Sequence, residues 1–410
     1  MDFQDTPEEA AFRAAARDFL AKNAERRSGR SYVSRSILAD PQSLHAAKAW
    51  QRRKADAGFV GITWPKRWGG GGGTAIQQVI YNQEEAEYVV PRGVYEIGLG
   101  MCIPTMLAYA RPEQLERYVG PAIRGEEIWC QLFSEPAAGS DLAGLRTRAE
   151  RDGPDWIVNG QKIWTSGAHF SDFGILVVRT DPAARKHDGL TFFFLDMKSP
   201  GIEVRRIKQI SGMSHFNEVF FTDVRIPDAQ RLGDVGAGWK VSLTTLMNER
   251  LAVGEAYGPD FAEIFALARE LSLEDGPAVK NPAVRERLAD WYVKTQGLKY
   301  TRFRTLTALS RGQTPGPEAS ISKVVSAAKL QDIASFALDL MGMAGGVMDA
   351  ELASAHAMFQ EALLYAPGMR IAGGSDEILR NIIAERVLGL PPDVRVDKDV
   401  PFNRLPTGKR

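Results

Sequence analysis

Hydrophobic residues recur with helical spacing at the start of the chain. Phe12, Ala15 and Phe19 are separated by three and four residues, which places them on one face of a helix. Thr6 and Pro7, followed by two glutamates, form a typical helix start, because a hydroxyl can cap the free amides and proline suits the first turn. The pattern predicts a helix that begins directly after Thr6.

The hydrophobic pattern then changes twice along the chain. Helical spacing continues to about residue 128, with a loop predicted at Gly69–Gly73, and short β-rich runs follow from Trp129 to Leu232. From Trp239 to Leu390 the spacing is helical again, in long runs rich in Ala, Leu, Arg and Glu. We therefore expect an N-terminal helical domain over residues 1–128, a middle β domain over 129–232, a C-terminal helical domain over 233–392 and an extended tail over 393–410.

The middle segment contains several strand patterns. The runs before and after Asn159-Gly160 are apolar and aromatic, and this dipeptide is a strong signal for a hairpin turn. We therefore expect a hairpin centred on Asn159 and Gly160. Further strands are predicted at Gly174–Arg179, Leu190–Leu195, Ile202–Arg206 and Glu218–Val224.

Composition excludes several classes of protein. The chain has 410 residues with 51 basic and 51 acidic side chains, so it lacks the positive excess of a general nucleic-acid binder. Two cysteines and five scattered histidines give no disulfide framework and no metal-ligand spacing. The N-terminus is acidic and no apolar run is long enough to span a bilayer, so we expect no membrane span and a cytoplasmic location.

Common nucleotide and hydrolase motifs are absent from the sequence. There is no GxxxxGK[ST] loop, no GxGxxG after a strand and no GxSxG elbow. Gly69–Gly73 could wrap a phosphate through its amides, but no Lys or Ser/Thr stands where such a loop needs one. A plain loop is the favoured interpretation.

Three other segments can carry chemistry. They read FSEPAAGSD (133–141), NGQKIWTSGA (159–168) and GGSDEILRNIIAERVLGLP (373–391). Taken singly, each has an ordinary structural interpretation: a strand exit, a core tryptophan beside solvated hydroxyls, and a capped helix start. In this order, and on a helix–β–helix background, they are much more specific.

Together the three motifs resemble those of the acyl-CoA dehydrogenase family of flavoenzymes. The resemblance covers nearly the whole chain, up to Gly389-Leu390-Pro391. It implies a mostly helical α+β fold with an N-terminal helical domain, a middle β-barrel or sandwich domain and a C-terminal four-helix bundle. It also implies FAD between the β domain and the C-terminal helices, an acyl-CoA substrate, an electron-transferring flavoprotein as acceptor, and a homo-oligomer, usually a homotetramer.

The resemblance also assigns roles to single residues. Ser375 and Glu377 correspond to positions at the ribityl, pyrophosphate or adenosine end of FAD, and Ser140 to a position near the CoA portion of the substrate. Trp164 is expected to pack on the flavin. The flavin-ring contacts implied by the first two motifs are Gln131, Phe133, Ser134, Trp164, Thr165 and Ser166.

The catalytic base does not stand at its commonest family position. Many members carry a glutamate just before the glycine of the third motif, where this chain has Gly373. A second family position lies on the first long helix after the β domain, and Glu249-Arg250 resembles that context. By helical spacing Glu249 shares an apolar face with Leu246, Ala252, Val253 and Ala256, and burial there would raise its pKa toward that of a base.

The resemblance therefore implies Glu249 as the base, Arg250 as a residue that organises the site, and the Gly373 amide as a donor to the thioester oxygen. A structural salt bridge remains the alternative for Glu249.

Two other functions remain open at this stage. The chain could be a non-catalytic FAD-binding partner in a hetero-oligomer, or a flavin oxidase or monooxygenase on the same fold. The residues of a neighbouring subunit that would complete the FAD site also stay open, because Asp339 replaces a glutamine usual in the family.

Overall fold

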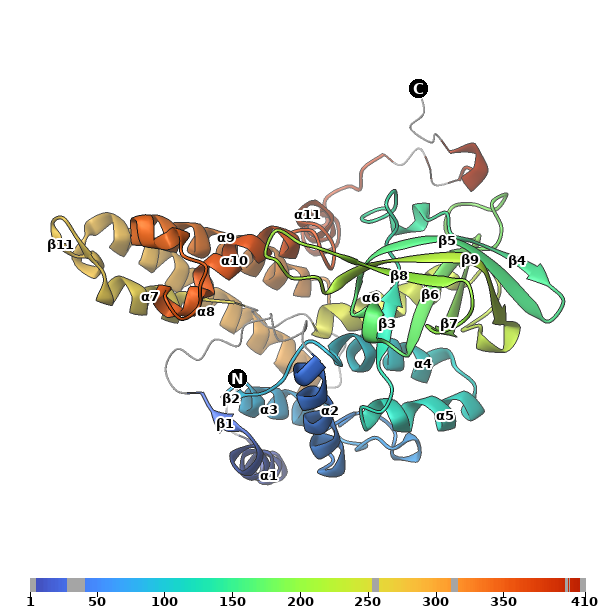
Figure 1. Cartoon of the computed structure of the whole chain (residues 1–410), viewed down its shortest axis with the longest axis horizontal. Coiled ribbons are helices and arrows are strands. Elements are labelled where there is room, and N and C mark those ends of the chain that lie inside the picture. Colours follow the sequence, from blue (N-terminus) through green and yellow to red (C-terminus); the bar gives the residue numbers. More distant parts are fainter. Residues whose placement is uncertain are drawn as a thin grey trace. The chain divides into compact units, whose positions relative to one another are not determined.

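The computed structural model describes residues 5–27, 41–252, 258–310, 316–394, 397 and 399–405. The chain divides into two compact units, which differ in their secondary structure (Figure 1). The helical unit comprises Met1–Arg35, Thr74–Val90 and Val253–Pro392. The sheet unit comprises Ser36–Gly73, Pro91–Ala252 and Asp393–Arg410.

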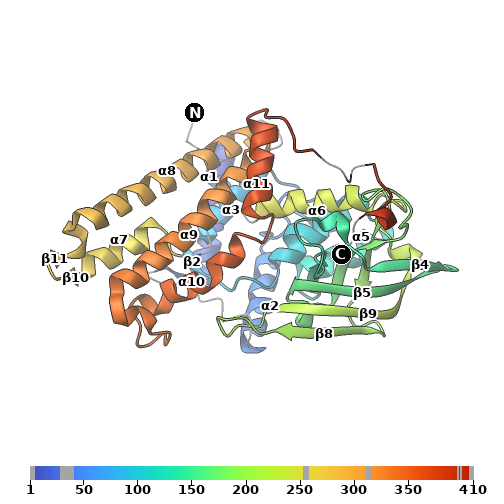
Figure 2. The ribbon, with the colours of Figure 1, turned by 90° about the horizontal axis from the view of Figure 1, so that it is seen from above.

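Helices make up most of the helical unit (Figure 2). Strand β1 (Glu25–Arg26) pairs with β2 (Tyr88–Val89), and β10 (Ser272–Leu273) pairs with β11 (Gly276–Pro277). The helices are α1 (Pro7–Asn23), α3 (Ala75–Glu85), α7 (Phe261–Glu270), α8 (Pro282–Ser310), α9 (Ala319–Met341), α10 (Met358–Met369) and α11 (Asp376–Ile382).

The predicted start of the first helix is confirmed. Thr6 caps α1: its hydroxyl accepts the amide of Glu9 at 3.2 Å, and its own amide donates to the Glu9 carboxylate at 2.8 Å. Pro7 occupies the first helical position. This reciprocal pair satisfies two amides that the helix itself leaves free.

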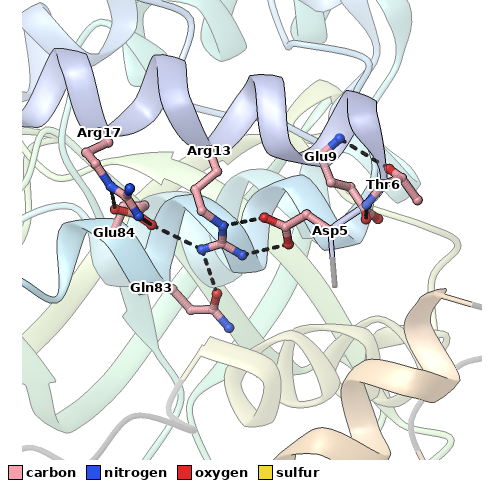
Figure 3. A network of polar contacts seen from close by, with 7 residues as sticks. All are labelled: Asp5, Thr6, Glu9, Arg13, Arg17, Gln83 and Glu84. Carbon is pink, nitrogen blue, oxygen red and sulfur yellow. Dashed lines mark hydrogen bonds and ion pairs between the residues drawn. The ribbon is translucent and has the colours of Figure 1, made fainter. Parts of the chain in front are cut away.

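An ion-pair network joins α1 to α3 (Figure 3). Arg17 donates twice to the carboxylate of Glu84, at 2.9 Å each, and Arg13 donates to the same carboxylate at 3.1 Å. Arg13 also binds Asp5 at 2.6 Å and Gln83 at 3.0 Å. Glu84 is buried, and its two arginines keep the pKa of its carboxyl low against the effect of burial.

Helices α7 to α10 form a bundle around one apolar core. Leu267 of α7, Trp291 of α8, Ile333 of α9 and Phe359 of α10 belong to the same cluster of buried side chains. Trp291 also donates its indole N–H to Asp332 at 2.8 Å, so the one polar atom of the ring has a partner. The predicted C-terminal four-helix bundle is confirmed in this packing.

The sheet unit is built on one curled sheet of seven strands. The strand order is β3-β6-β4-β5-β9-β8, with β7 beside β6. The strands are β3 (Trp129–Leu132), β4 (Arg148–Asp152), β5 (Asp155–Ser166), β6 (Phe173–Arg179), β7 (Leu190–Asp196), β8 (Ile202–Ile207) and β9 (Phe216–Pro227). The helices of this unit are α2 (Pro41–Asp56), α4 (Ile103–Tyr109), α5 (Pro112–Ile123) and α6 (Gly238–Ala252).

Two apolar cores use opposite faces of this sheet. Phe192 and Phe194 belong to one core together with Val119 of α5, and Phe193 belongs to the other core. Side chains alternate along a strand, so β7 contributes to both cores. This explains why Leu190–Leu195 is apolar without alternation, and the helices and sheet together confirm the α+β class.

The hairpin turn predicted at Asn159 and Gly160 is wrong. Both residues lie inside the continuous strand β5, where its register against β9 shifts. Gly160 has φ 152°, and a Cβ there would come within 2.5 Å of the Thr147 hydroxyl, so the close approach requires glycine. The actual hairpin joins β4 to β5 through Gly153 and Pro154.

The loop predicted at Gly69–Gly73 is present, and neighbouring backbone satisfies all five of its amides. For the last three glycines the acceptors are carbonyl groups eight to eleven residues earlier in the chain, at 2.7 to 3.0 Å. These amides are therefore not available to wrap a phosphate. The donors and acceptors pair as Gly71 with Gly61, Gly72 with Trp64, and Gly73 with Ile62.

The described part of the tail packs on the sheet unit. Lys186 pairs with Asp397 at 2.9 Å and with Asp141 at 2.6 Å. The Phe402 ring lies over the guanidinium of Arg179, 3.4 Å from its carbon to the ring centroid. The tail thus packs on the loop between β6 and β7, and Lys186 of that loop also pairs with the end of the first motif.

Within the described ranges, no helix is both long and apolar enough to cross a membrane. The same part of the chain contains no group of three or more His, Cys, Asp or Glu side chains arranged to hold a metal ion.

Candidate functional site

The first motif is a loop that follows β3 in the sheet unit. Phe133 is buried and packs edge-to-face on Phe192, with ring centroids 5.7 Å apart. Gln131 and Ser134 are half-buried, whereas Ser140 is exposed. This segment therefore has a buried apolar anchor and polar side chains that are partly or fully exposed.

The second motif is tied directly to the first. The carbonyl of Ser134 accepts the amide of Ile163, in β5, at 2.9 Å. Lys162 donates to the carbonyl of Phe133 at 3.0 Å and to the carboxylate of Glu135 at 2.8 Å. The structure thus brings the two motifs together, and Lys162 is a residue of this site that the sequence analysis did not single out.

Trp164 has an unusual backbone and an unusual exposure. Its φ is 60° and its side chain is 55% exposed, although Phe216 supports it edge-to-face at 5.9 Å. A left-handed conformation is costly for a bulky residue, and such strain is concentrated at functional sites. The strand therefore holds an aromatic ring at the surface of the unit instead of burying it.

Thr165, next in the strand, is 2% exposed, and its hydroxyl has no hydrogen-bond partner among the described residues. A buried hydroxyl without a partner is uncommon in folded proteins. Ser166 is half-buried. The second motif thus contains an exposed aromatic side chain and, next in sequence, a buried hydroxyl without a hydrogen-bond partner among the described residues.

Helix α6 carries the candidate base, Glu249, on its last turn. One turn earlier, the buried Thr245 hydroxyl bonds that of Thr105, in α4, at 2.8 Å. This part of α6 therefore packs against α4 and against the π-helical turn Gly98–Cys102 that precedes α4. The side chains of Glu249 and Arg250 lie outside the described residues, as do Val253 and Ala256 of the predicted apolar face.

The third motif belongs to the helical unit. Gly373 and Gly374 both have positive φ, 66° and 94°, a conformation that favours glycine. Ser375 caps α11 by accepting the amide of Ile378 at 3.4 Å. Hydrogen bonds from its own amide and from the Ser375 hydroxyl hold the pKa of the exposed Glu377 carboxyl below its usual range.

Two contacts hold this glycine loop in place, and the sequence analysis predicted neither of them. Lys323 of α9 donates to the carbonyl of Gly374 at 2.5 Å, and Arg370 pairs with the buried Asp376 at 2.7 Å across the ends of the loop. No sequence signal marks Lys323 as a support of this loop, because its partner is a backbone atom 51 residues away.

Sequence models of the three acyl-CoA dehydrogenase domains match most of the chain. The N-terminal domain matches residues 6–126, the middle domain residues 130–224 and the C-terminal domain residues 236–388. The acyl-CoA dehydrogenase IpdE1 of Mycobacterium tuberculosis is 36% identical over 394 residues, which are 94% of this chain and 98% of that protein. The protein is thus an oxidoreductase by class. It belongs to the acyl-CoA dehydrogenase family.

Other similar proteins support the assignment to this family. FadE34 of the same organism, another acyl-CoA dehydrogenase, is 39% identical over 82% of this chain, but the match spans only 45% of the length of FadE34. The solved Tcur3481-Tcur3483 steroid ACAD has a TM-score of 0.79 at 26% identity and covers 96% of this chain and 100% of that one. The ChsE4-ChsE5 complex from M. tuberculosis has a TM-score of 0.74 at 26% identity, with the same coverage.

The family implies FAD, and the residues of the sheet unit fit it. A flavin needs a flat aromatic or apolar surface and hydrogen-bonding groups for its ring. Trp164 offers an exposed indole, Thr165 a buried hydroxyl without a partner, and Gln131 and Ser134 half-buried polar side chains. The predicted family and fold class are confirmed, whereas the roles of single residues and the bounds of the four predicted segments stay predictions.

Proposed function

We propose that this protein uses FAD to oxidise an acyl-CoA thioester to the 2-enoyl-CoA, and that the acyl group carries a ring system. The family and the fit of the sheet unit to a flavin support the reaction. The ring system is supported by the steroid ACAD, which is similar over almost its whole length. The observation that carries the proposal is that the sequence has a glycine, Gly373, at the usual base position and a glutamate, Glu249, at the second base position on α6.

In this proposal the first two motifs hold the cofactor. Gln131, Phe133 and Ser134 contact the flavin ring from one segment, and Thr165 and Ser166 contact it from the other, where Trp164 packs on the ring. In the helical unit, Ser375 and Glu377 serve the ribityl, pyrophosphate or adenosine end. When bound, FAD supplies the acceptor for the hydride that leaves the β carbon.

Glu249 removes the α proton of the substrate. A carboxylate is suited to this step when a partly apolar environment raises its pKa. Gly373 has no side chain to act as a base, but its amide remains a donor for the thioester oxygen, where negative charge develops. Arg250 organises the base, and Ser140, which is exposed at the end of the first motif, lies toward the CoA portion.

A second candidate function is supported by the ChsE4-ChsE5 complex, whose name describes two chains. In that case this chain is the FAD-binding partner of a related chain in a hetero-oligomer, and the base belongs to the other chain. The first candidate predicts activity for a homo-oligomer of this chain, dimer or tetramer, with an electron-transferring flavoprotein as acceptor.

The test is anaerobic bleaching of the bound flavin by a panel of straight-chain, branched and ring-bearing acyl-CoA thioesters. We expect the purified chain to contain FAD and to be bleached fastest by ring-bearing substrates, with turnover restored by an electron-transferring flavoprotein. Bleaching only after co-expression with a second dehydrogenase chain would establish the partner function instead. Rapid peroxide formation from the reduced protein would indicate an oxidase, and a chain that binds no FAD would refute the proposal.

A further inference from the structure

A buried lysine, Lys162, links the two motifs that are proposed to hold the flavin. The side chain of Lys162 has no exposed surface, and that of its partner Glu135 is 6% exposed. Burying an ammonium group is costly unless its donors are satisfied. Here the ammonium donates to two acceptors in the first motif, the Phe133 carbonyl and the Glu135 carboxylate.

Glu135 is equally well satisfied. Besides Lys162, its carboxylate accepts the amide of Arg146 at 2.6 Å and the amide of Thr147 at 2.9 Å. Burial raises the pKa of this carboxyl, but the charge of Lys162 and the hydrogen bonds from Lys162, Thr147 and Arg146 together outweigh that effect, and the net shift is downward. Burial also lowers the pKa of the Lys162 ammonium, against the attraction of Glu135. Through these hydrogen bonds the pair ties the loop to the segment that enters β4.

The position of Lys162 in the chain makes this pair relevant to the cofactor. Lys162 stands two residues before Trp164 in β5, and its two acceptors stand on either side of Ser134. The amide of Ile163 adds a bond to the Ser134 carbonyl itself. One side chain therefore links the two segments that carry the proposed flavin contacts.

A purely structural role would not require a charge in this place. Well-packed apolar residues of similar volume often replace a buried ion pair with little loss of stability, or even with a gain. An ion pair whose partners include a ligand-binding backbone segment does more than fill space, because it fixes that segment in one conformation before the ligand binds.

We propose that Lys162 is a positioning residue for FAD, which sets the conformation of the Phe133–Glu135 segment against β5. The inference rests on the proposed FAD-dependent function. It predicts that removal of the ammonium weakens FAD binding more than it weakens the fold.

The variant that tests this is Lys162→Met, which keeps an unbranched side chain without the charge. Dilution of the holoenzyme, followed by flavin fluorescence, gives the apparent Kd for FAD, and tryptophan fluorescence gives the unfolding temperature without FAD. We expect the Kd to rise at least about tenfold, since 1.4 kcal/mol corresponds to a factor of ten, with an altered visible spectrum of the bound flavin. A Kd within about twofold of the wild-type value in a folded variant would overturn the inference.

A matched control and a second variant separate positioning from stability. Asp228→Asn removes the charge from another side-chain network of the sheet unit, with Trp156 and Arg231, and should lower the unfolding temperature without changing the Kd. If Lys162→Met leaves Glu135 too costly to bury, the double variant Lys162→Met/Glu135→Leu removes both charges. It should fold and show the same weak FAD binding, and wild-type affinity in the double variant would also overturn the inference.

The wild-type protein provides a test that needs no substitution. Hydrogen exchange of the Arg146 and Thr147 amides, both donors to Glu135, should already be slow in the full chain after FAD is removed. Protection that develops only when FAD is added would contradict positioning by Lys162. A wild-type chain that binds no FAD would instead refute the proposed function.

Discussion

Phe402 is the most informative residue to change in the tail. Its ring lies 3.4 Å from the guanidinium carbon of Arg179, and Arg179 is only 3% exposed. The amides of Phe402 and Asn403 donate to carbonyls of the loop between β6 and β7, at 2.9 Å each. Phe402→Ala removes the ring and leaves these backbone bonds to hold the segment.

The expected magnitude follows from the burial of the cation. Burial lowers the pKa of Arg179 to about 10, so the side chain is still charged at neutral pH. A desolvated cation–π contact contributes about 2 kcal/mol, and a local loss of that size speeds exchange of the Asn403 amide about 30-fold. Phe402→Leu keeps most of the apolar contact, so it should lose this electrostatic part alone.

Hydrogen exchange with peptide-level mass spectrometry measures the effect on residues 399–405. The control is Asp399→Asn, which breaks an exposed ion pair with Arg185 and should change little, because such pairs contribute little. Asn403 exchange within about twofold of wild type in Phe402→Ala would refute the reasoning. Wild-type exchange in Phe402→Leu would show that the cation–π contact does not hold the tail.

Two further predictions concern single groups. Cys102 and Cys130 are both buried, and burial raises the pKa of the Cys130 thiol to about 12. Iodoacetamide at pH 8 should therefore label neither thiol in the native protein and both thiols after unfolding. Rapid labelling of the native protein would contradict the fold. A hydrogen bond from Arg231, aided by one from Trp156, lowers the pKa of Asp228 from 3.8 to about 2. Because a lowered carboxyl pKa stabilises the fold above the unfolded value, wild type should exceed Asp228→Asn by about 1–2 kcal/mol near neutral pH, and this difference should vanish as the pH falls from about 4 to 2. An equal difference in urea unfolding at pH 6 and pH 2.5 would show that the carboxylate is not the cause.

The sequence predicted a helix or strand correctly where a single local feature, such as a cap residue or an apolar run, is enough to define it. The cap at Thr6 and the apolar run of β7 are such cases. Asn159-Gly160 misled because the same dipeptide suits a turn and a bulge, and only the register with β9 decides between them. Pairing between strands depends on contacts that no single window of sequence contains.

In the candidate site, too, local motifs were predictable from the sequence and contacts between distant residues were not. Motifs point to Trp164 and Ser134 because their spacing is local, but Lys162 looks like an ordinary solvent-facing residue of a strand. Its burial depends on Glu135, 27 residues earlier. The support of the glycine loop by Lys323 likewise arises only when α9 packs beside it.

The central claim is that Glu249 takes the α proton, and the most direct measurement is the single-turnover rate of flavin reduction in Glu249→Gln. The variant should retain FAD and bind a ring-bearing acyl-CoA, because the substitution keeps size and polarity. Loss of a general base predicts anaerobic reduction slower by about a hundredfold to ten-thousandfold. Reduction at nearly the wild-type rate, with FAD fully bound, would contradict the assignment of the base.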